Sequence, residues 1–333
     1  MGVVLSTTDL AVGYRKGKRT TTVLGGLNLH LHEATLVSLL GANGAGKSTL
    51  LRTLSGVQPP VSGIVRIGGK DIAEYKHSEL SRLVSIVTTD RTFAGGLTVE
   101  ELVGLGRQPH TGFLGRLGYE DRRVIADAIE AVGMGYKYHS SIAELSDGER
   151  QKVMIAKALA QEAPLIILDE PTAFLDVASR IEVMQLLHDL SRSAGKSILM
   201  STHDVAQAMA MSDRLWLLGA NGRVADSVTE DAVFGGLMDG LFKSSSIRFD
   251  GISGDYTYVS GSGKCVSVSG SSPDLVHWCE NALARNGFRI SASADLKVVI
   301  NGIGEIIIAT AGFEEKVVSV GQLLSLLKEK GFM

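Results

Sequence analysis

Eight consecutive residues carry the strongest chemical signal in the sequence: Gly41, Ala42, Asn43, Gly44, Ala45, Gly46, Lys47 and Ser48. They match the phosphate-loop pattern of a glycine, four residues and then Gly-Lys-Ser/Thr. Because glycine lacks a Cβ, the backbone can curl with its N–H groups pointing inward around a phosphate. Lys47 can reach the β- and γ-phosphates of a nucleotide, and the Ser48 hydroxyl can hold Mg²⁺. We therefore predict an ATP site here that runs on to Thr49, although the loop alone does not say how the ATP is used.

The residues around this loop predict the elements that must position it. Residues 36–40 form a short apolar run that is typical of a buried strand, and residues 49–54 begin a helix. The N-terminus of that helix adds about half a positive charge next to the phosphates. Tyr14 ends an earlier predicted strand, and two roles stay open for it. Its ring is either part of the core or stacks on the adenine.

Three further polar segments follow along the chain. The first begins a predicted helix and consists of Leu145, Ser146, Asp147, Gly148 and Glu149. Ser146 and Glu149 have the spacing of a capping box, so a plain capped helix is the simpler interpretation. The second is Asp169-Glu170, which ends an apolar strand, and the third is His203, which ends another. Taken singly, these could be a solvated strand end and a structural histidine.

In this order, the phosphate loop and the three segments resemble the nucleotide-binding subunit of an ABC transporter, over about residues 1–242. The resemblance implies an α/β fold: a P-loop NTPase core with an antiparallel β subdomain and a helical subdomain at about 97–161. It implies ATP and Mg²⁺ as cofactors and Lys47 as a catalytic residue. Asp169 would bind Mg²⁺ with Ser48, Glu170 would polarise the attacking water, and His203 would contact the γ-phosphate.

The resemblance also implies that two copies of the chain act together. Residues 145–149, with a hydroxyl and backbone N–H groups at a helix start, would close over the ATP of the other copy. Residues 174–176 match the family's loop between subunits and assign Asp176 to it.

Two departures from the family pattern matter. Residues 145–149 read Leu-Ser-Asp-Gly-Glu where the usual form is Leu-Ser-Gly-Gly-Gln, and this change keeps the serine and the second glycine. The family usually has a glutamine after the strand at 84–87, linking the metal to the membrane subunits, whereas this chain has Thr88-Thr89-Asp90. We hypothesise that Asp90 or one of the threonines serves as an outer-shell Mg²⁺ ligand, because a carboxylate suits that hard cation.

Residues 97–110 and 115–121 narrow the resemblance to ATPases of importers for ferric siderophores, haem and vitamin B12. Such importers combine two ATPases with two transmembrane permease subunits and a substrate-binding protein. The resemblance thus implies an iron chelate as cargo, with haem or cobalamin next. It places the chain peripherally at the cytoplasmic face of a prokaryotic inner membrane.

Composition bounds the remaining possibilities. The chain has 333 residues and a net charge of −3. It therefore lacks the polybasic surface that would indicate nucleic acid as a partner. No apolar run approaches the ~18 residues of a membrane span, and the N-terminus lacks the layout of a signal peptide. Cys265 and Cys279 have neither metal nor redox spacing. We expect a cytosolic protein in a reducing compartment.

Hydrophobic patterns predict the remaining elements. The expected strands cover residues 3–5, 10–14, 27–31, 63–68, 83–87, 165–168 and 197–202, with a hairpin at 215–225. The expected helices of this part cover residues 97–103, 119–132 and 181–190, and a further helix after residues 145–149 carries Val153, Ala156, Leu159 and Ala160. The basic run at 15–19 is expected to be a solvated hairpin tip.

The tail has a different composition. Residues 243–254 are predicted to be a linker, and 255–333 a small accessory α+β domain with helices at about 273–285 and 320–329. We expect this domain to serve in dimerisation or packing, with regulation by cargo or partner as the alternative.

Two rival functions remain for the whole chain. A soluble ABC-type ATPase acting on ribosomes or DNA usually has two such domains, a long coiled coil or a basic surface, and this sequence has none of these. The missing glutamine suggests a nucleotide-gated scaffold with little hydrolysis, but the presence of Glu170 and His203 argues for turnover.

Overall fold

The computed structural model describes residues 2–17, 19–88, 96–112, 115–242, 247–251, 253–258 and 263–332. The chain divides into two compact units, each described by itself below. The first unit comprises Met1–Lys243 and Gly251–Asp255, and the second comprises Ser244–Asp250 and Tyr256–Met333. In the described residues, no helix has the combined length and apolar character that crossing a membrane requires.

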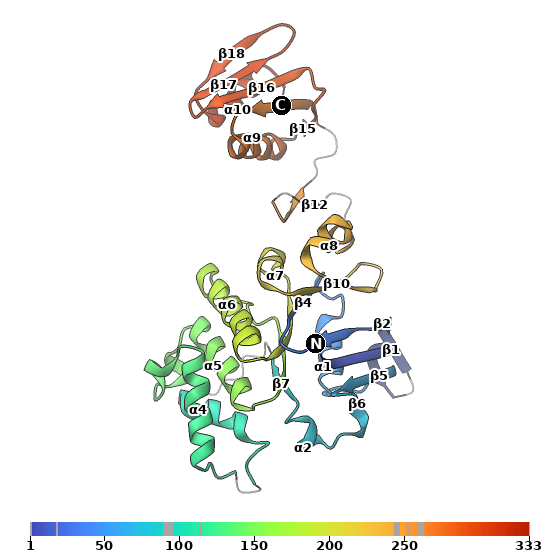
Figure 1. Cartoon of the computed structure of the whole chain (residues 1–333). Helices are drawn as coiled ribbons and strands as arrows, with labels where there is room; N and C mark the ends of the chain where they lie inside the picture. Colours follow the sequence, from blue (N-terminus) through green and yellow to red (C-terminus); the bar gives the residue numbers. More distant parts are fainter. Residues whose placement is uncertain are drawn as a thin grey trace. The chain divides into compact units, whose positions relative to one another are not determined.

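A six-stranded sheet forms the centre of the first unit (Figure 1), in the order β11-β10-β4-β9-β8-β7. Its strands are β4 Leu36–Gly41, β7 Val84–Val87, β8 Leu165–Asp169, β9 Ser197–Thr202, β10 Arg214–Leu218 and β11 Val224–Ser227. All neighbours are parallel except β10 and β11. The central strands are buried on both faces, which explains why they are continuous apolar runs in the sequence.

Successive residues of these strands pack into two different cores. On one face, Leu39 and Ile167 contact a cluster that includes Leu50 of helix α1 (Lys47–Leu54). On the other face, Ile166 and Ile198 belong to a cluster with helices α5 (Asp147–Ala160) and α6 (Val177–Ser193). The alternation follows from the two-residue period of a strand. The sheet is thereby held between helices, with its carboxyl edge free for loops.

The helical block predicted at about 97–161 is present and contains α3 (Val99–Gly104), α4 (Tyr119–Ala131) and α5. The capping boxes of Thr98 with Glu101 and of Ser146 with Glu149 are confirmed. Figure 1 shows α4, α5 and α6 together on one side of the first unit. The remaining short helices of this unit are α2 His77–Leu80, α7 Val205–Met211, α8 Thr229–Phe234 and the 3₁₀ turns η1 Ile72–Glu74, η2 Leu105–Arg107, η3 Gly135–Lys137, η4 Ile142–Glu144 and η5 Leu237–Gly240.

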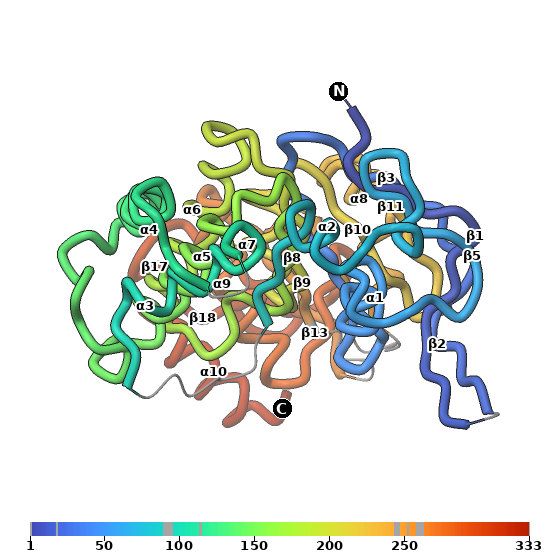
Figure 2. The backbone as a smooth tube through the Cα atoms, turned by 90° about the horizontal axis from the view of Figure 1, so that it is seen from below, coloured from blue at the N-terminus to red at the C-terminus, as the bar shows by residue number. Residues whose placement is uncertain are grey.

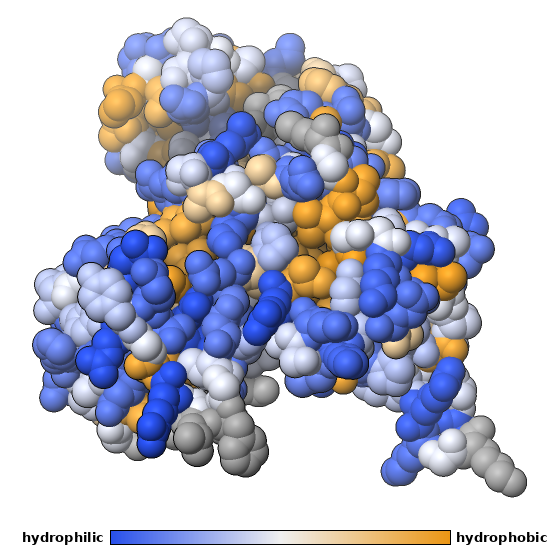
Figure 3. Space-filling view, turned by 60° about the horizontal axis from the view of Figure 1, so that its bottom comes forward, coloured by the Kyte–Doolittle hydropathy of each residue, from blue (hydrophilic) through white to orange (hydrophobic). Residues whose placement is uncertain are grey.

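An antiparallel sheet flanks α1, with the order β2-β1-β5-β6 and β3 paired to β1. Its strands are β1 Val3–Lys16, β2 Arg19–Leu27, β3 His30–His32, β5 Ser62–Ile67 and β6 Lys70–Asp71. The hairpin of β1 and β2 extends from the unit in Figure 2, and Figure 3 shows mainly hydrophilic atoms on its coloured part. Arg15, Lys16 and Arg19 are exposed there, as expected for a solvated tip.

The strand predictions at 3–5 and 10–14 are confirmed, although the two segments are continuous, and the strand predicted at 27–31 is wrong in part. The expected strands at 3–5 and 10–14 are one strand, β1, which continues through a register shift near Asp9, where φ is 44°. The expected strand at 27–31 is interrupted, because the backbone N–H of Leu29 donates to Oγ1 of Thr7 instead of a strand partner. Leu27, Leu29 and Leu31 are all buried, so their alternation resembled that of a strand.

The second unit contains a five-stranded sheet in the order β15-β14-β16-β17-β18 and two helices. The elements are β14 Cys265–Gly270, α9 Pro273–Arg285, β15 Arg289–Ile290, β16 Leu296–Gly302, β17 Glu305–Ala309, β18 Glu314–Val317 and α10 Val320–Glu329. Leu283 of α9 and Leu323 of α10 pack in one cluster with Val298 and Ile308 of the sheet. The sequence did not predict β18, because an edge strand made of Glu-Glu-Lys-Val lacks an apolar pattern.

A strand also lies within residues 243–254, where we expected only a linker. This strand, β12 (Ile247–Asp250), pairs with β13 (Asp255–Tyr258) in a two-stranded sheet.

Candidate active site

The phosphate loop connects β4 to α1, and its shape depends on glycine at two positions. Gly44 has a φ of 75° and Gly46 a φ of 109°, both in the left-handed region that side chains disfavour. A Cβ on Gly46 would also lie 2.7 Å from Cγ1 of Val23. Asn43, Gly44 and Ser48 are exposed, so the loop is accessible from solvent.

Lys47, the first residue of α1, is 5% exposed, and its ammonium lies back over the loop. Its Nζ donates hydrogen bonds to the carbonyl oxygens of Gly41 at 2.8 Å and Ala42 at 3.3 Å. Burial lowers the pKa of Lys47, and the nearby carboxylates of Glu170 and Asp169 partly oppose this shift. The two hydrogen bonds hold the buried ammonium at the loop, where its charge can attract an anion.

The two carboxylates lie at the carboxyl end of β8, next to the end of β9. The hydroxyl of Ser201 in β9 donates to Oδ1 of Asp169 at 2.6 Å, and it accepts the backbone N–H of Glu170 at 2.9 Å. Glu170 has a φ of 47°, a conformation that is uncommon for a residue with a side chain. This turn brings Oε1 of Glu170 to 4.0 Å from Nζ of Lys47.

His203 follows β9 directly and approaches the same carboxylate. Its Nδ1 lies 3.8 Å from Oε2 of Glu170, and its side chain is 53% exposed. The next residue, Asp204, caps α7 through the N–H of Gln207 and forms an ion pair with Arg180 at 3.0 Å. These contacts hold the backbone that carries His203. The structure thus brings together Lys47, Asp169, Glu170 and His203 at one edge of the sheet.

Tyr14 lies on β1 beside the helix that follows the loop. Its hydroxyl is 2.6 Å from Oγ1 of Thr49, and the residue is 50% exposed. The core-aromatic alternative is therefore excluded, while the ring remains accessible to a ligand.

Residues 145–149 lie at the start of α5, on the helical block. Ser146 caps the helix, and its Oγ accepts the N–H of Glu149 at 3.2 Å. The carboxylate of Glu149 accepts the N–H of Ser146 at 2.9 Å and the hydroxyl of Tyr136 at 2.8 Å, and it pairs with Lys137 at 3.2 Å. The pKa of Glu149 is lowered to about 2. The largest cause is the hydrogen bond from the Ser146 backbone, and the next is the hydrogen bond from Tyr136.

The same segment is packed closely against α6. A Cβ on Gly148 would lie 2.7 Å from Oγ of Ser179, so only glycine fits without a shift. Leu145 is buried, and Asp147 forms an ion pair with Arg150 at 3.2 Å.

Asp176 caps α6, accepting the N–H of Ser179 at 2.8 Å and its hydroxyl at 3.1 Å. The backbone hydrogen bond from Ser179 lowers the pKa of Asp176. Residues 89–95 are outside the described part of the chain, and the predicted metal contact of Asp90 falls among them.

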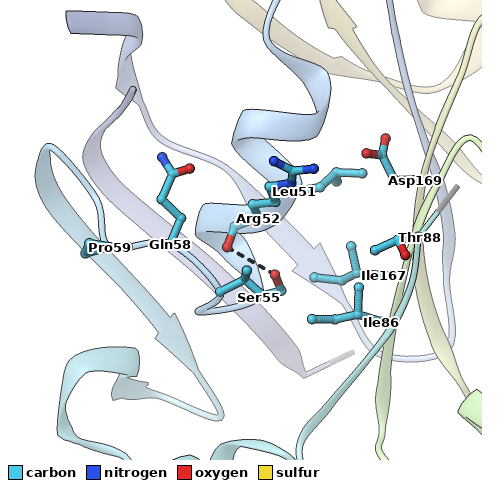
Figure 4. Close-up of a pocket in the computed structure, with 10 residues that line it drawn as sticks. Leu51, Arg52, Ser55, Gln58, Pro59, Ile86, Thr88, Ile167 and Asp169 are labelled. Atoms are coloured by element: carbon cyan, nitrogen blue, oxygen red, sulfur yellow. Dashed lines mark hydrogen bonds between the residues drawn. The ribbon is translucent and has the colours of Figure 1, made fainter. Parts of the chain in front are cut away.

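A cavity of about 370 Å³ lies beside the carboxylate of Asp169 (Figure 4). Leu51, Arg52 and Ser55 line it from α1 and the turn that follows, with Thr88 and Asp169 on its opposite side. The cavity therefore extends from Asp169 at the end of β8 to Thr88 after the end of β7.

No local sequence pattern distinguishes Ser201, Tyr136 or Lys137 as residues of the site. The position of Ser201 beside Asp169 depends on the pairing of β8 with β9, in which these two residues are partners. Tyr136 and Lys137 lie on a separate 3₁₀ turn, η3, and only packing of the helical block brings them to Glu149.

Comparison with known proteins followed the same division of the chain. Residues 24–173 match the family model described as ABC transporter, and residues 262–328 match the model described as iron ABC transporter C-terminal domain.

Two curated relatives and one solved structure are similar over most of the first unit. The iron(3+)-hydroxamate import ATP-binding protein FhuC of Bacillus subtilis (strain 168) is 41% identical over 208 residues, 62% of this chain and 76% of that protein. The ferric enterobactin transport ATP-binding protein FepC of Escherichia coli (strain K12) is 34% identical over 234 residues, 70% of this chain and 85% of that protein. A dimeric ATP-binding cassette in a post-hydrolysis state, with ADP and phosphate bound, has a TM-score of 0.58 and 27% identity, covering 68% of this chain and 98% of that one.

Proposed function

Because this chain belongs to the family of ABC transporter ATP-binding proteins, we propose that it hydrolyses ATP to drive import of an iron chelate. The main support for hydrolysis is the position of the Glu170 carboxylate. Its Oε1 lies 4.0 Å from Nζ of Lys47, and its Oε2 lies 3.8 Å from Nδ1 of His203. A base and two groups that can contact a phosphate therefore share one small volume.

Each residue has a distinct task in this proposal. The backbone of residues 41–48 and Lys47 bind the phosphates, and the ring of Tyr14 stacks on the adenine. Glu170 orients and polarises the attacking water, and His203 contacts the γ-phosphate. The buried ammonium of Lys47 stabilises the charge that develops on the transferred phosphoryl group, because water screens it poorly there.

The oxygen donors at this edge fit a Mg²⁺ that is held largely by the nucleotide. Ser48 offers an exposed hydroxyl on the first turn of α1, and Asp169 a carboxylate at the end of β8. Among the described residues, no group of three or more His, Cys, Asp or Glu could hold a metal by itself. Mg²⁺ typically uses one or two protein oxygens, several waters and the substrate phosphates. When bound, it would neutralise charge on the phosphates.

Two copies of the chain are proposed to sandwich two ATP molecules. Ser146 and the N–H groups at the start of α5 would cover the γ-phosphate bound by the partner copy, and Asp176 would lie in the loop between them. The dimeric cassette that this chain resembles supports the arrangement.

The remaining partners are two transmembrane permeases and, through them, a substrate-binding protein. The chain would lie peripherally on the cytoplasmic face of the membrane. The cavity between α1 and Thr88 is a suitable place for the permease to sense the site, since Asp169 also lines it. Within the segment Thr88-Thr89-Asp90, we propose Asp90 as an outer-shell Mg²⁺ ligand. An Asp90→Ala variant with unchanged ATPase rate and Mg²⁺ dependence would refute that role.

An iron chelate is the favoured cargo because FhuC is named for iron(3+)-hydroxamate import and FepC for ferric enterobactin transport, and because the tail matches the iron ABC transporter C-terminal domain. Haem and cobalamin are the next candidates. The tail itself is proposed to dimerise or pack, with regulation as the alternative. A chain lacking 246–333 that keeps ATPase and transport, with and without substrate, would exclude regulation.

The decisive experiment reconstitutes the chain with its permeases and binding protein in liposomes. We expect Mg-ATP to support phosphate release and uptake of a ⁵⁵Fe-labelled siderophore, both lost in Glu170→Gln. Phosphate release no higher than that of Glu170→Gln would favour the nucleotide-gated scaffold. Release that is independent of permeases, with no co-purifying membrane partner, would favour a soluble ATPase.

A further inference from the structure

Ser201 is a buried hydroxyl between the two acidic residues of the site. The residue has no exposed surface, and it lies in β9 directly beside Asp169 in β8. Its Oγ donates its only proton to Oδ1 of Asp169 at 2.6 Å and accepts the backbone N–H of Glu170 at 2.9 Å. One side chain thereby contacts both candidate catalytic positions.

The two hydrogen bonds have different consequences. The first holds Oδ1 of Asp169 against β9, so that its other oxygen, Oδ2, is the one offered to a cation. The second holds the N–H of Glu170 in a turn with a φ of 47°, a conformation that needs support from its surroundings. That turn places the Glu170 carboxylate between Lys47 and His203.

We propose that Ser201 is a positioning residue for hydrolysis, which fixes the metal-binding direction of Asp169 and the backbone turn of Glu170. This inference rests on the proposed ATPase function and adds a residue to it. Ser201 touches neither nucleotide nor water in this scheme and acts only through its two neighbours.

A purely structural role is the competing explanation, since the hydroxyl also joins β8 to β9. The chain provides a matched control in Ser85, which lies on β7 at the other side of β8. Ser85 is 1% exposed, and its hydroxyl has no hydrogen-bond partner among the residues that the structure describes. The substitution Ser85→Ala therefore removes a buried serine hydroxyl from the same sheet and leaves the hydrogen bonds of Asp169 and Glu170 unchanged.

The test compares Ser201→Ala, Ser201→Thr and Ser85→Ala in the full chain, each first checked for folding by thermal unfolding. The first readout is Mn²⁺ binding, by electron paramagnetic resonance, in the presence of saturating non-hydrolysable ATP analogue. The second is analogue binding in EDTA, and the third is kcat and KM for ATP.

We expect Ser201→Ala to weaken Mn²⁺ binding on the order of tenfold, because a buried hydrogen bond to a charged group is lost. Its kcat should fall at least as much, while analogue binding in EDTA stays within about twofold of wild type, since the phosphate loop is untouched. Ser201→Thr, which keeps the hydroxyl, should restore Mn²⁺ binding, and Ser85→Ala should match wild type.

Equal Mn²⁺ binding in Ser201→Ala and Ser85→Ala would overturn the inference, whatever their melting temperatures. Should Ser201→Ala not fold, Ser201→Cys takes its place with the same expectations, because its thiol is a weak donor of similar size. Absence of phosphate release from the wild type would refute the proposed function instead. The Mn²⁺ measurement would still test whether Ser201 positions Asp169 for metal binding.

Discussion

The hydroxyl of Tyr14 is hydrogen-bonded to Oγ1 of Thr49, with 2.6 Å between the two oxygens. Thr49 lies in the first turn of α1, so this bond ties the long strand β1 to the phosphate loop. Tyr14 is half exposed, and its ring is held in place by its own hydroxyl. The pair therefore joins the two parts of the chain proposed to contact the base and the phosphates.

Substitutions at Tyr14 should separate the ring from the hydroxyl. Tyr14→Ala is expected to weaken ATP binding about tenfold, because aromatic stacking contributes on the order of 1 kcal/mol. Tyr14→Phe keeps the ring and should bind ATP within about threefold of wild type. Calorimetric titration with ATP measures both. Because Tyr14→Ala removes both the ring and the hydroxyl, an equal loss of binding in Tyr14→Phe and Tyr14→Ala would show that the hydroxyl, and not stacking, is what matters.

Glu170→Gln should separate nucleotide binding from hydrolysis. The amide keeps the size of the side chain but cannot act as a base, so phosphate release should fall at least about 100-fold while ATP still binds. With hydrolysis blocked, ATP should also convert the monomer to a dimer on size-exclusion chromatography. Substantial residual turnover would mean that a different group activates the water.

Gly46→Ala should disrupt the phosphate loop. The added Cβ meets Val23 at 2.7 Å and the φ of 109° disfavours any side chain, so ATP binding should be lost and the free energy of unfolding should fall by about 1–3 kcal/mol. Gly112→Ala is the control, since a Cβ there meets no atom of the described residues within 4 Å and the φ is not in the left-handed range. Urea unfolding and ATP titration of both variants check the expectation, which fails if the two behave alike.

The ionised form of Glu149 should stabilise the fold at neutral pH but not in acid. Its pKa is lowered from 4.5 to about 2, so the unfolded chain binds a proton more readily than the folded one. The contribution is fully present above pH 4.5 and disappears as the pH falls toward 2. The free energy of unfolding should therefore decline less steeply in Glu149→Gln than in wild type between pH 5 and 3. Urea unfolding at several pH values measures this, and parallel curves for the two proteins would contradict it.

Several features of this protein depend on local physics and can be predicted from short stretches of sequence. A loop of three glycines before a lysine, apolar runs that alternate with helices, and the capping boxes of α3 and α5 are all encoded within a few residues. The same is true of α9 and α10, whose bounds agree with the expected ones. Errors occurred where partners distant in the chain decide, as at Leu29, whose N–H bonds to Thr7.

The contacts across the site, in contrast, depend on strand pairing and helix packing between distant parts of the chain. Strand β9 lies beside β8, and this pairing brings Ser201 to Asp169 and His203 to Glu170. Packing of the helical block brings Tyr136 and Lys137 to Glu149 in the same way. A hydroxyl or an ammonium has no local pattern that names its partner. The role of such a group follows from the sheet order and the helix packing. Burial of apolar side chains from all parts of the chain establishes both.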